Sequence, residues 1–71
     1  MSESKYEVII FWDKEDRIFV AEVPELPGCI AHGNSKADAI QNAEEAISLW
    51  LKTAKEDGIS LPEPKGKLMY A

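Results

Sequence analysis

Residues 23–29 read VPELPGC and place two prolines and one glycine within a single turn of the chain. Proline fixes φ and has no amide hydrogen to donate to a sheet, so Pro24 and Pro27 predict the end of a strand. Gly28 permits backbone dihedral angles that other residues resist. Leu26, between the prolines, is predicted to insert into the core. We interpret the stretch chiefly as a rigid structural corner, with a preformed rim for a partner as the alternative.

Two predicted strands precede this corner and form a β-hairpin. KYEVIIFW, residues 5–12, and RIFVAEV, residues 17–23, are rich in the β-branched and aromatic residues that favour strands. The polar stretch DKED, residues 13–16, predicts a four-residue loop between them.

The register of the hairpin decides which side chains share a face, because side chains alternate along a strand with a period of two. A loop at residues 13–16 pairs Trp12 with Arg17 and places Glu7 opposite Glu22. One face is then wholly apolar and is predicted to pack on a helix. On the second face, two of the predicted cross-strand pairs are apolar and the third pair is acidic. A chain of this size covers only one face well, so the second face is predicted to contact a partner or another copy of the chain through Ile9, Phe11, Ile18, Val20, Glu7 and Glu22.

The residues after the corner predict a short third strand and one long helix. The strand is CIAHG, residues 29–33, and the helix follows it directly. Ser35 is predicted as the N-cap, with Asp38 three positions later as in a capping box, and Gly58 as the C′ residue. Leu49 is predicted on the outer side of the helix and joins the candidate interface. The apolar stripe predicted to face the sheet consists of Ile40, Ala43, Ile47, Trp50, Leu51 and Ala54.

A brief edge strand at KLMY, residues 67–70, completes the predicted order β-β-β-α-β. Residues 1–71 are therefore expected to form a single α+β domain, with an antiparallel sheet and one helix on one face. A domain of this size is only marginally stable alone. One cysteine excludes an internal disulfide, and a single histidine beside it argues against a structural zinc site. Oligomerisation, most simply as a homodimer, or a tightly bound partner is the remaining route to stability.

The net charge of -5, from thirteen acidic and eight basic residues, restricts the partners of the chain. Such a surface repels the phosphates of nucleic acids and attracts basic partners. The sequence has no N-terminal apolar run and no stretch long enough to cross a membrane. We therefore expect a cytoplasmic protein that binds neither nucleic acid nor membranes.

Candidate catalytic residues are few, and each has a simpler interpretation. His32 is the only histidine, and Cys29 lies an odd number of residues before it, so in a strand the two side chains point to opposite faces. Asp13, Glu15 and Asp16 form an acidic cluster, but at a hairpin tip such a cluster is more often a solvated turn. Nuclease carboxylates lie within a cleft around their metal ions. We therefore predict no enzyme activity, no metal and no cofactor.

The run FVAEVPELPGCIAHGNSKADAIQNAEEAISLWL, residues 19–51, closely resembles the HicB-like antitoxin family. VPELPGC at residues 23–29, GNS at residues 33–35 and EDGISLPEP at residues 56–64 match the ordered motifs of that family. The resemblance implies an incomplete ribonuclease H-like fold and a role in a type II toxin–antitoxin pair. The implied partner is HicA, a small basic toxin that resembles a double-stranded RNA-binding domain and cleaves messenger RNA. HicB-like domains bind this toxin and cover its catalytic histidine.

The chain departs from the family pattern in two respects. It stops at Ala71 without the C-terminal DNA-binding module that family members often carry, so we expect no operator binding. Its hairpin loop also lacks the glycines common in the family. The predicted function is the neutralisation of a HicA-type toxin by occlusion. The alternative is an orphan oligomeric regulatory or structural domain of the same fold without a toxin.

Overall fold

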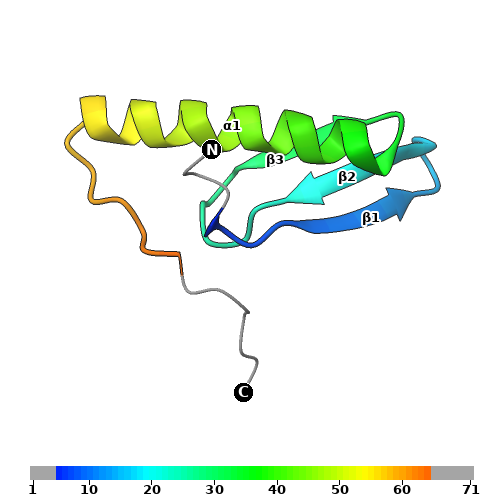
Figure 1. The fold of residues 1–71 in the computed structure, drawn as a ribbon, viewed down its shortest axis with the longest axis horizontal. Helices are drawn as coiled ribbons and strands as arrows, with labels where there is room; N and C mark the ends of the chain where they lie inside the picture. Colours follow the sequence, from blue (N-terminus) through cyan, green and yellow to red (C-terminus); the bar gives the residue numbers. More distant parts are fainter. Residues whose placement is uncertain (1–4, 65–71) are drawn as a thin grey trace, which may run out of the picture.

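A three-stranded antiparallel sheet with one long helix on one face makes up the fold (Figure 1). The computed structural model describes residues 5–64. The elements are β1, Ile9–Asp13; β2, Ile18–Glu22; β3, Ile30–Gly33; and α1, Lys36–Glu56. The predicted α+β class, antiparallel sheet and single helix are confirmed, whereas the strand predicted at residues 67–70 lies outside the described residues. The likeness to ribonuclease H stays a prediction. Among the described residues, no helix combines the length and the apolar character that crossing a membrane requires.

The register of the β1–β2 hairpin differs by two positions from the predicted one. Trp12 pairs with Phe19, so the predicted pairing of Trp12 with Arg17 is wrong. The rings of Trp12 and Phe19 meet edge to face, with centroids 4.9 Å apart. A shift of two positions leaves every side chain on its predicted face, because the alternation also has a period of two.

The cause of the shift lies in the turn between the two strands. Asp13 belongs to β1 instead of the loop, and its Oδ1 accepts hydrogen bonds from the backbone amides of Glu15, at 3.0 Å, and Asp16, at 3.2 Å. Arg17 closes the turn with a φ of 55°, in the left-handed region. An aspartate that binds the amides two and three residues later is typical of turns. The loop therefore occupies residues 14–17 instead of residues 13–16.

The corner between β2 and β3 is a small hydrogen-bonded loop. The amide of Val23 donates to the carbonyl of Cys29 at 3.0 Å, that of Leu26 donates to Val23 at 3.1 Å, and that of Cys29 donates to Leu26 at 2.9 Å. Gly28 has a φ of 78°, which a residue with a Cβ adopts only with strain. The side chain of Leu26 is fully buried, while both prolines are exposed. The corner therefore turns the chain and also supplies a residue of the core.

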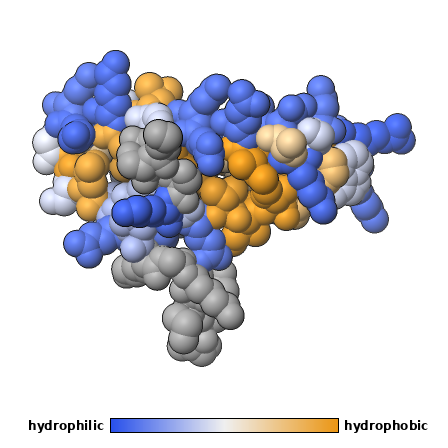
Figure 2. All heavy atoms as spheres, in the orientation of Figure 1, coloured by the Kyte–Doolittle hydropathy of each residue, from blue (hydrophilic) through white to orange (hydrophobic). Residues whose placement is uncertain are grey.

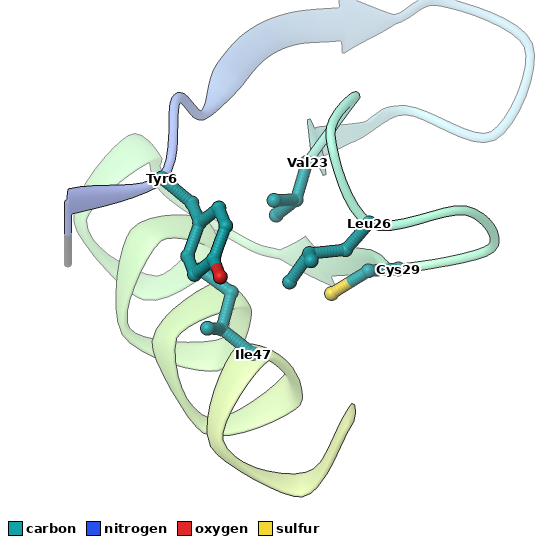
Figure 3. Packing of buried hydrophobic residues seen from close by; sticks show 5 residues of the cluster. All are labelled: Tyr6, Val23, Leu26, Cys29 and Ile47. Atoms are coloured by element: carbon teal, nitrogen blue, oxygen red, sulfur yellow. The ribbon is translucent and has the colours of Figure 1, made fainter. Parts of the chain in front are cut away.

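The core consists of two clusters between the sheet and α1. The first surrounds the corner, where the side chains of Tyr6, Val23, Leu26, Cys29 and Ile47 converge (Figure 3). The second lies under the N-terminal half of α1 and contains four alanines: Ala21, Ala31, Ala39 and Ala43. Small side chains allow the helix to approach the sheet closely at this end. The larger side chains of the first cluster fill the space at the other end.

Helix α1 begins and ends with well-formed caps. The Ser35 side chain accepts a hydrogen bond from the amide of Asp38 at 3.1 Å. At the other end, Gly58 has a φ of 73° and its amide donates to the carbonyl of Lys55 at 3.1 Å. The amide of Ile59 donates to the carbonyl of Ala54 at 2.8 Å. This pair of bonds around a left-handed glycine is a Schellman motif, which satisfies carbonyls that the helix leaves without partners.

The predicted apolar stripe of α1 is wrong at Ile40. This residue is 41% exposed, and Ala39, one position earlier, is fully buried in its place. A Cβ added to Gly33 would lie 2.3 Å from the backbone nitrogen of Ala39, so helix and strand touch here through their backbones. Such close approach leaves room for alanine but not for isoleucine.

Candidate functional site

The face of the sheet opposite α1 is the first candidate protein-binding surface. Val8, Ile10, Phe19, Ala21 and Ala31 pack toward the helix, so the residues that alternate with them point away from it. Figure 2 shows apolar atoms gathered over the β1–β2 hairpin, below the mostly hydrophilic outer surface of α1. We call the outward-pointing set the open sheet face; it contains Ile9, Phe11, Ile18, Val20, Glu22, Ile30 and His32.

The apolar residues of the open sheet face differ in how much they offer to a partner. The register aligns Phe11, Val20 and His32 in one row across the three strands. Phe11 is 42% exposed, but Val20, in the central strand between its two neighbours, is only 3% exposed. Ile30 on β3 is 47% exposed. Phe11 and Ile30 are therefore the most exposed apolar side chains of this face, whereas Val20 supports the face from within.

The predicted opposition of Glu7 and Glu22 is wrong. Glu22 is exposed and lies between Ile9 on β1 and Ile30 on β3. Glu7 precedes β1 and does not face Glu22 in this register. The face therefore carries one carboxylate flanked by two isoleucines, and it contains no cross-strand repulsion that a partner would relieve.

Ile30 and His32 were missed as members of this face by the sequence analysis. The sequence pattern that could have placed them is the alternation along β3, in which Ile30 and His32 are exposed on one side and Ala31 and Gly33 are buried on the other. It becomes informative only once β3 is known to pair with β2, which brings Ile30 beside Glu22 and His32 beside Val20. The second face then extends over three strands instead of two.

The candidate catalytic residues are not brought together by the fold. His32 is exposed on the open sheet face, and its backbone carbonyl accepts a hydrogen bond from Nδ2 of Asn42 at 2.7 Å. Cys29 is buried on the opposite side, and burial raises the pKa of its thiol. A raised pKa lowers the thiolate fraction, which is the reactive form. The two side chains therefore form no nucleophile–base pair.

At the acidic hairpin tip, the Asp13 carboxylate stabilises the turn. One carboxylate oxygen of Asp13 already accepts the two amide hydrogen bonds described above. Lys14 and Arg17 lie in the same turn as Glu15 and Asp16, so both signs of charge are present. Within residues 5–64, no group of three or more His, Cys, Asp or Glu side chains is arranged to hold a metal ion.

A second apolar surface lies between the start of β3 and the C-terminal half of α1. The two elements enclose a groove of about 430 Å³. We call it the β3 groove; its apolar lining includes Cys29, Ile30, Leu49, Trp50, Ala54 and Ile59. Nε1 of Trp50 donates to the carbonyl of Pro27 at 2.9 Å, which ties the helix wall to the corner. Leu49, placed on the outer side of the helix by the sequence analysis, is 65% exposed at the lip of this groove.

The sequence motifs and this fold agree with one known family. The family model for the HicB-like antitoxins of bacterial toxin–antitoxin systems matches residues 6–69. The chain belongs to the HicB-like antitoxin family. A toxin protein is therefore the general class of partner that membership of this family implies.

Relatives of this HicB-like chain occur in archaea and in a bacteriophage. A UPF0150 protein of Thermoplasma acidophilum is 41% identical over 58 residues, which cover 82% of this chain and 83% of the relative. A UPF0150 protein of Archaeoglobus fulgidus is 39% identical over 56 residues, covering 76% and 80%. An uncharacterised 14.9 kDa protein of Haemophilus phage HP1 is 40% identical over 45 residues, covering 63% of this chain and 34% of the phage protein. No solved structure matches the chain significantly.

The motifs that identify this HicB-like domain build its fold. Leu26 of the VPELPGC motif fills the core, and Gly33 of the GNS motif allows the contact with Ala39. Ser35 of the same motif caps α1. The two exposed apolar surfaces lie largely outside these motifs, at side chains such as Phe11 and Leu49. The identifying motifs therefore account for the fold and not for the two exposed apolar surfaces.

Proposed function

We propose that this HicB-like domain neutralises a small basic, RNA-cleaving toxin of the HicA type by binding it through the open sheet face. The observation that carries the proposal is a half-exposed apolar face with a carboxylate at one end of it. Phe11 and Ile30 are 42% and 47% exposed, and Glu22 lies beside Ile30 in the register. An apolar centre with polar groups at its margin is a common organisation of protein interfaces.

Charge supports a basic partner. The chain has a net charge of -5, and the exposed carboxylate of Glu22 lies on the open sheet face itself. Complementary charge accelerates association and suppresses binding of wrong partners. The protein acts by occlusion and takes no catalytic part itself. Because the target of such a toxin is messenger RNA, we place the pair in the cytoplasm.

The first experiment is co-purification with a small basic protein encoded beside this gene, followed by an RNA-cleavage assay with and without this chain. We expect a stable complex and loss of cleavage at equimolar protein. A neighbouring toxin that cleaves RNA equally well in the presence of excess antitoxin would refute the proposal. The absence of any such neighbour would favour the orphan regulatory domain.

The second experiment places one charge on each side of the molecule. Phe11→Glu is expected to abolish neutralisation, because it puts a carboxylate in place of one of the two most exposed apolar side chains of the open sheet face. Ile40→Glu is the matched control, since Ile40 is 41% exposed but lies on α1, on the other side of the sheet. Equal effects of the two substitutions would show that the open sheet face is not the toxin-binding surface.

The third experiment tests the role of charge separately from apolar contact. Glu22→Lys is expected to slow association with the toxin, most strongly at low salt, because charges at an interface margin act mainly on the association rate. The substitution leaves the apolar residues of the face unchanged. An association rate that stays unchanged at low salt would contradict the electrostatic part of the proposal.

A further inference from the structure

The outer edge of β3 presents backbone hydrogen-bonding groups beside the β3 groove. We propose that this edge binds a short extended segment of the toxin as an added strand, with an apolar side chain of the segment in the β3 groove and a basic side chain over Ile30. The inference rests on the proposed function and deepens it. Ile30 lines the groove and also lies on the open sheet face, so one partner contacts both surfaces around this edge.

The pairing of β3 with β2 decides which backbone groups point outward. The amide of Val23 donates to the carbonyl of Cys29, so these two residues form a hydrogen-bonded pair. In an antiparallel sheet such pairs alternate with pairs that are not hydrogen-bonded, and the register makes Glu22 and Ile30 the next pair. The amide and the carbonyl of Ile30 therefore point away from β2, toward the side of β3 on which residues 5–64 place no further strand.

The far end of the same edge is closed by a side chain. The alternation also turns the carbonyl of His32 outward, and Nδ2 of Asn42 donates a hydrogen bond to it at 2.7 Å. A strand that paired with all of β3 would need the position that this side chain occupies. The edge is therefore open at Ile30 and closed at His32, which favours a short segment over a long strand and limits indiscriminate pairing.

The groove lies at the open end of the edge because α1 diverges from β3. At Gly33 the helix and the strand touch, so that a Cβ there would lie 2.3 Å from the nitrogen of Ala39. Toward the start of β3 the two elements separate, and the small side chains of Cys29 and Ala54 leave space between them. The hydrogen bond from Trp50 to the corner holds the helix wall in position. The groove is therefore preformed.

The alternation of side chains along a strand connects the edge with the groove. Ile30 points to the open sheet face, so Cys29 points to the helix side, where it lines the groove. In an added strand, the residue beside Ile30 lies on the open sheet face and its neighbour beside Cys29 points into the groove. Leu49, which is 65% exposed, forms the lip over that neighbour. Main-chain hydrogen bonds together with a pocket for an alternate side chain are the usual means of binding an added strand.

Charges around the edge favour a basic segment. Glu22 is exposed and lies beside Ile30 on the open sheet face. A lysine or arginine of the added strand can lay its apolar stem over Ile30 and bring its charge to this carboxylate. Asp57 lines the groove, and none of the described residues that line it is basic. A second copy of this chain fits less well, because its β3 has the sequence IAHG and offers neither lysine nor arginine.

Heteronuclear NMR of the isotope-labelled chain tests the edge with a defined probe, the capped peptide Ser-Leu-Lys-Leu-Ser. At millimolar concentration the peptide is expected to shift the amide signal of Ile30 and the indole N–H signal of Trp50. The indole N–H of Trp12, on β1 at the other edge of the sheet, is the internal control and should not shift. Glutamate in place of the lysine should weaken binding by about fivefold or more. N-methylation of the lysine amide, which removes the donor to the carbonyl of Ile30, should do the same.

Amide hydrogen exchange tests the same contact in the complex with the co-purified toxin. The amide of Ile30 is expected to exchange rapidly in the free chain, because it points to solvent, and about tenfold more slowly or less in the complex. The amide of Ala31 is the internal control. It points toward β2 and should be protected in both states.

Substitutions separate the backbone contact from the side-chain contact. Ile30→Pro should weaken toxin binding more than Ile30→Ala, since proline removes the outward amide without removing a bond to β2. Leu49→Ala should weaken binding by about fivefold or more. Ile40→Ala is its matched control, because Ile40 is 41% exposed on another face of α1, and it should leave binding unchanged. Far-UV circular dichroism verifies that each variant is folded.

The outcomes separate this inference from the proposed function. An Ile30 amide that is already protected in the free chain would overturn the inference, because a second copy or another part of the chain would then cover the edge. A neutralised toxin that leaves this amide unprotected would overturn the inference and leave the proposed function intact. If the lysine peptide shifts the Ile30 and Trp50 signals but no toxin binds, the edge stands as a site for basic extended segments and the proposed function fails. Unchanged signals, or equal binding of the glutamate peptide, would also overturn the inference.

Discussion

Replacement of Gly33 by alanine tests the close approach of α1 to the sheet. Gly33 ends β3 opposite Phe19, beneath the first turn of the helix. An added Cβ would lie 2.3 Å from the nitrogen and 2.8 Å from the Cα of Ala39, and 2.7 Å from the carbonyl carbon of Asp38. The positive φ angles among the described glycines belong to Gly28 and Gly58, so alanine at position 33 has no backbone strain of that kind. The whole cost of the substitution is steric.

The magnitude follows from these distances. Ordinary contact begins at 3.4 Å, so the first turn of α1 has to move by about 1 Å, because backbone atoms cannot rotate away. A gap of about 0.5–1 Å removes a quarter to a half of the contact energy across it, here between Ala39 and Ala43 on the helix and Ala21 and Ala31 on the sheet. Overpacking costs about 1–3 kcal/mol, and we expect the free energy of unfolding to fall by about 3 kcal/mol.

Urea unfolding, followed by far-UV circular dichroism at one protein concentration, measures this loss. Gly58→Ala is the control, because its φ is 73° but no atom lies within 4 Å of the added Cβ. Its cost is the strain of the left-handed region, about 1 kcal/mol. The free energy of unfolding of a small domain falls by about 1 kcal/mol for each 1 M of urea. The urea concentration at the midpoint of unfolding should therefore fall by about 3 M in Gly33→Ala and by about 1 M in Gly58→Ala. A loss in Gly33→Ala no larger than in Gly58→Ala would refute the argument.

Three further predictions concern the core and the helix cap. Burial raises the pKa of the Tyr6 hydroxyl above 10.0, with Glu25 and Glu63 adding to the effect, and burial raises that of the Cys29 thiol above 9.0. The folded state therefore keeps both groups neutral at a pH at which the unfolded state loses their protons. The free energy of unfolding should consequently decline as the pH rises above about 9. Tyr6→Phe should remove the part of this decline that occurs above about pH 10. Leu26→Ala, which empties a fully buried site, should lower the free energy of unfolding by about 2–5 kcal/mol in urea unfolding. Ser35→Ala should cost about 1 kcal/mol in the same assay and Ser35→Asp should restore it, because aspartate also accepts the amide of Asp38.

The helix ends and the corner were predictable from the sequence because their causes are local. Ser35 caps α1 through an amide three residues away, and Gly58 ends it through its own backbone conformation. Gly28 turns the corner by the same means. In each case the residue type and its near neighbours decide the structure. The α+β class follows as well, because the change from strand to helix composition occurs after β3, where Ser35 caps the helix.

The surfaces were only partly predictable because they depend on contacts between distant elements. The alternation of residues such as Phe11 indicated the open sheet face and survived the error in register, since a shift of two positions preserves the faces. Tertiary structure alone placed Ile30 on this face, through the pairing of β3 with β2. The rotation of α1 likewise follows from the backbone contact at Gly33, which buries Ala39 and exposes Ile40. The β3 groove arises because the same contact holds one end of the helix close while the large side chains of the core hold the other end away.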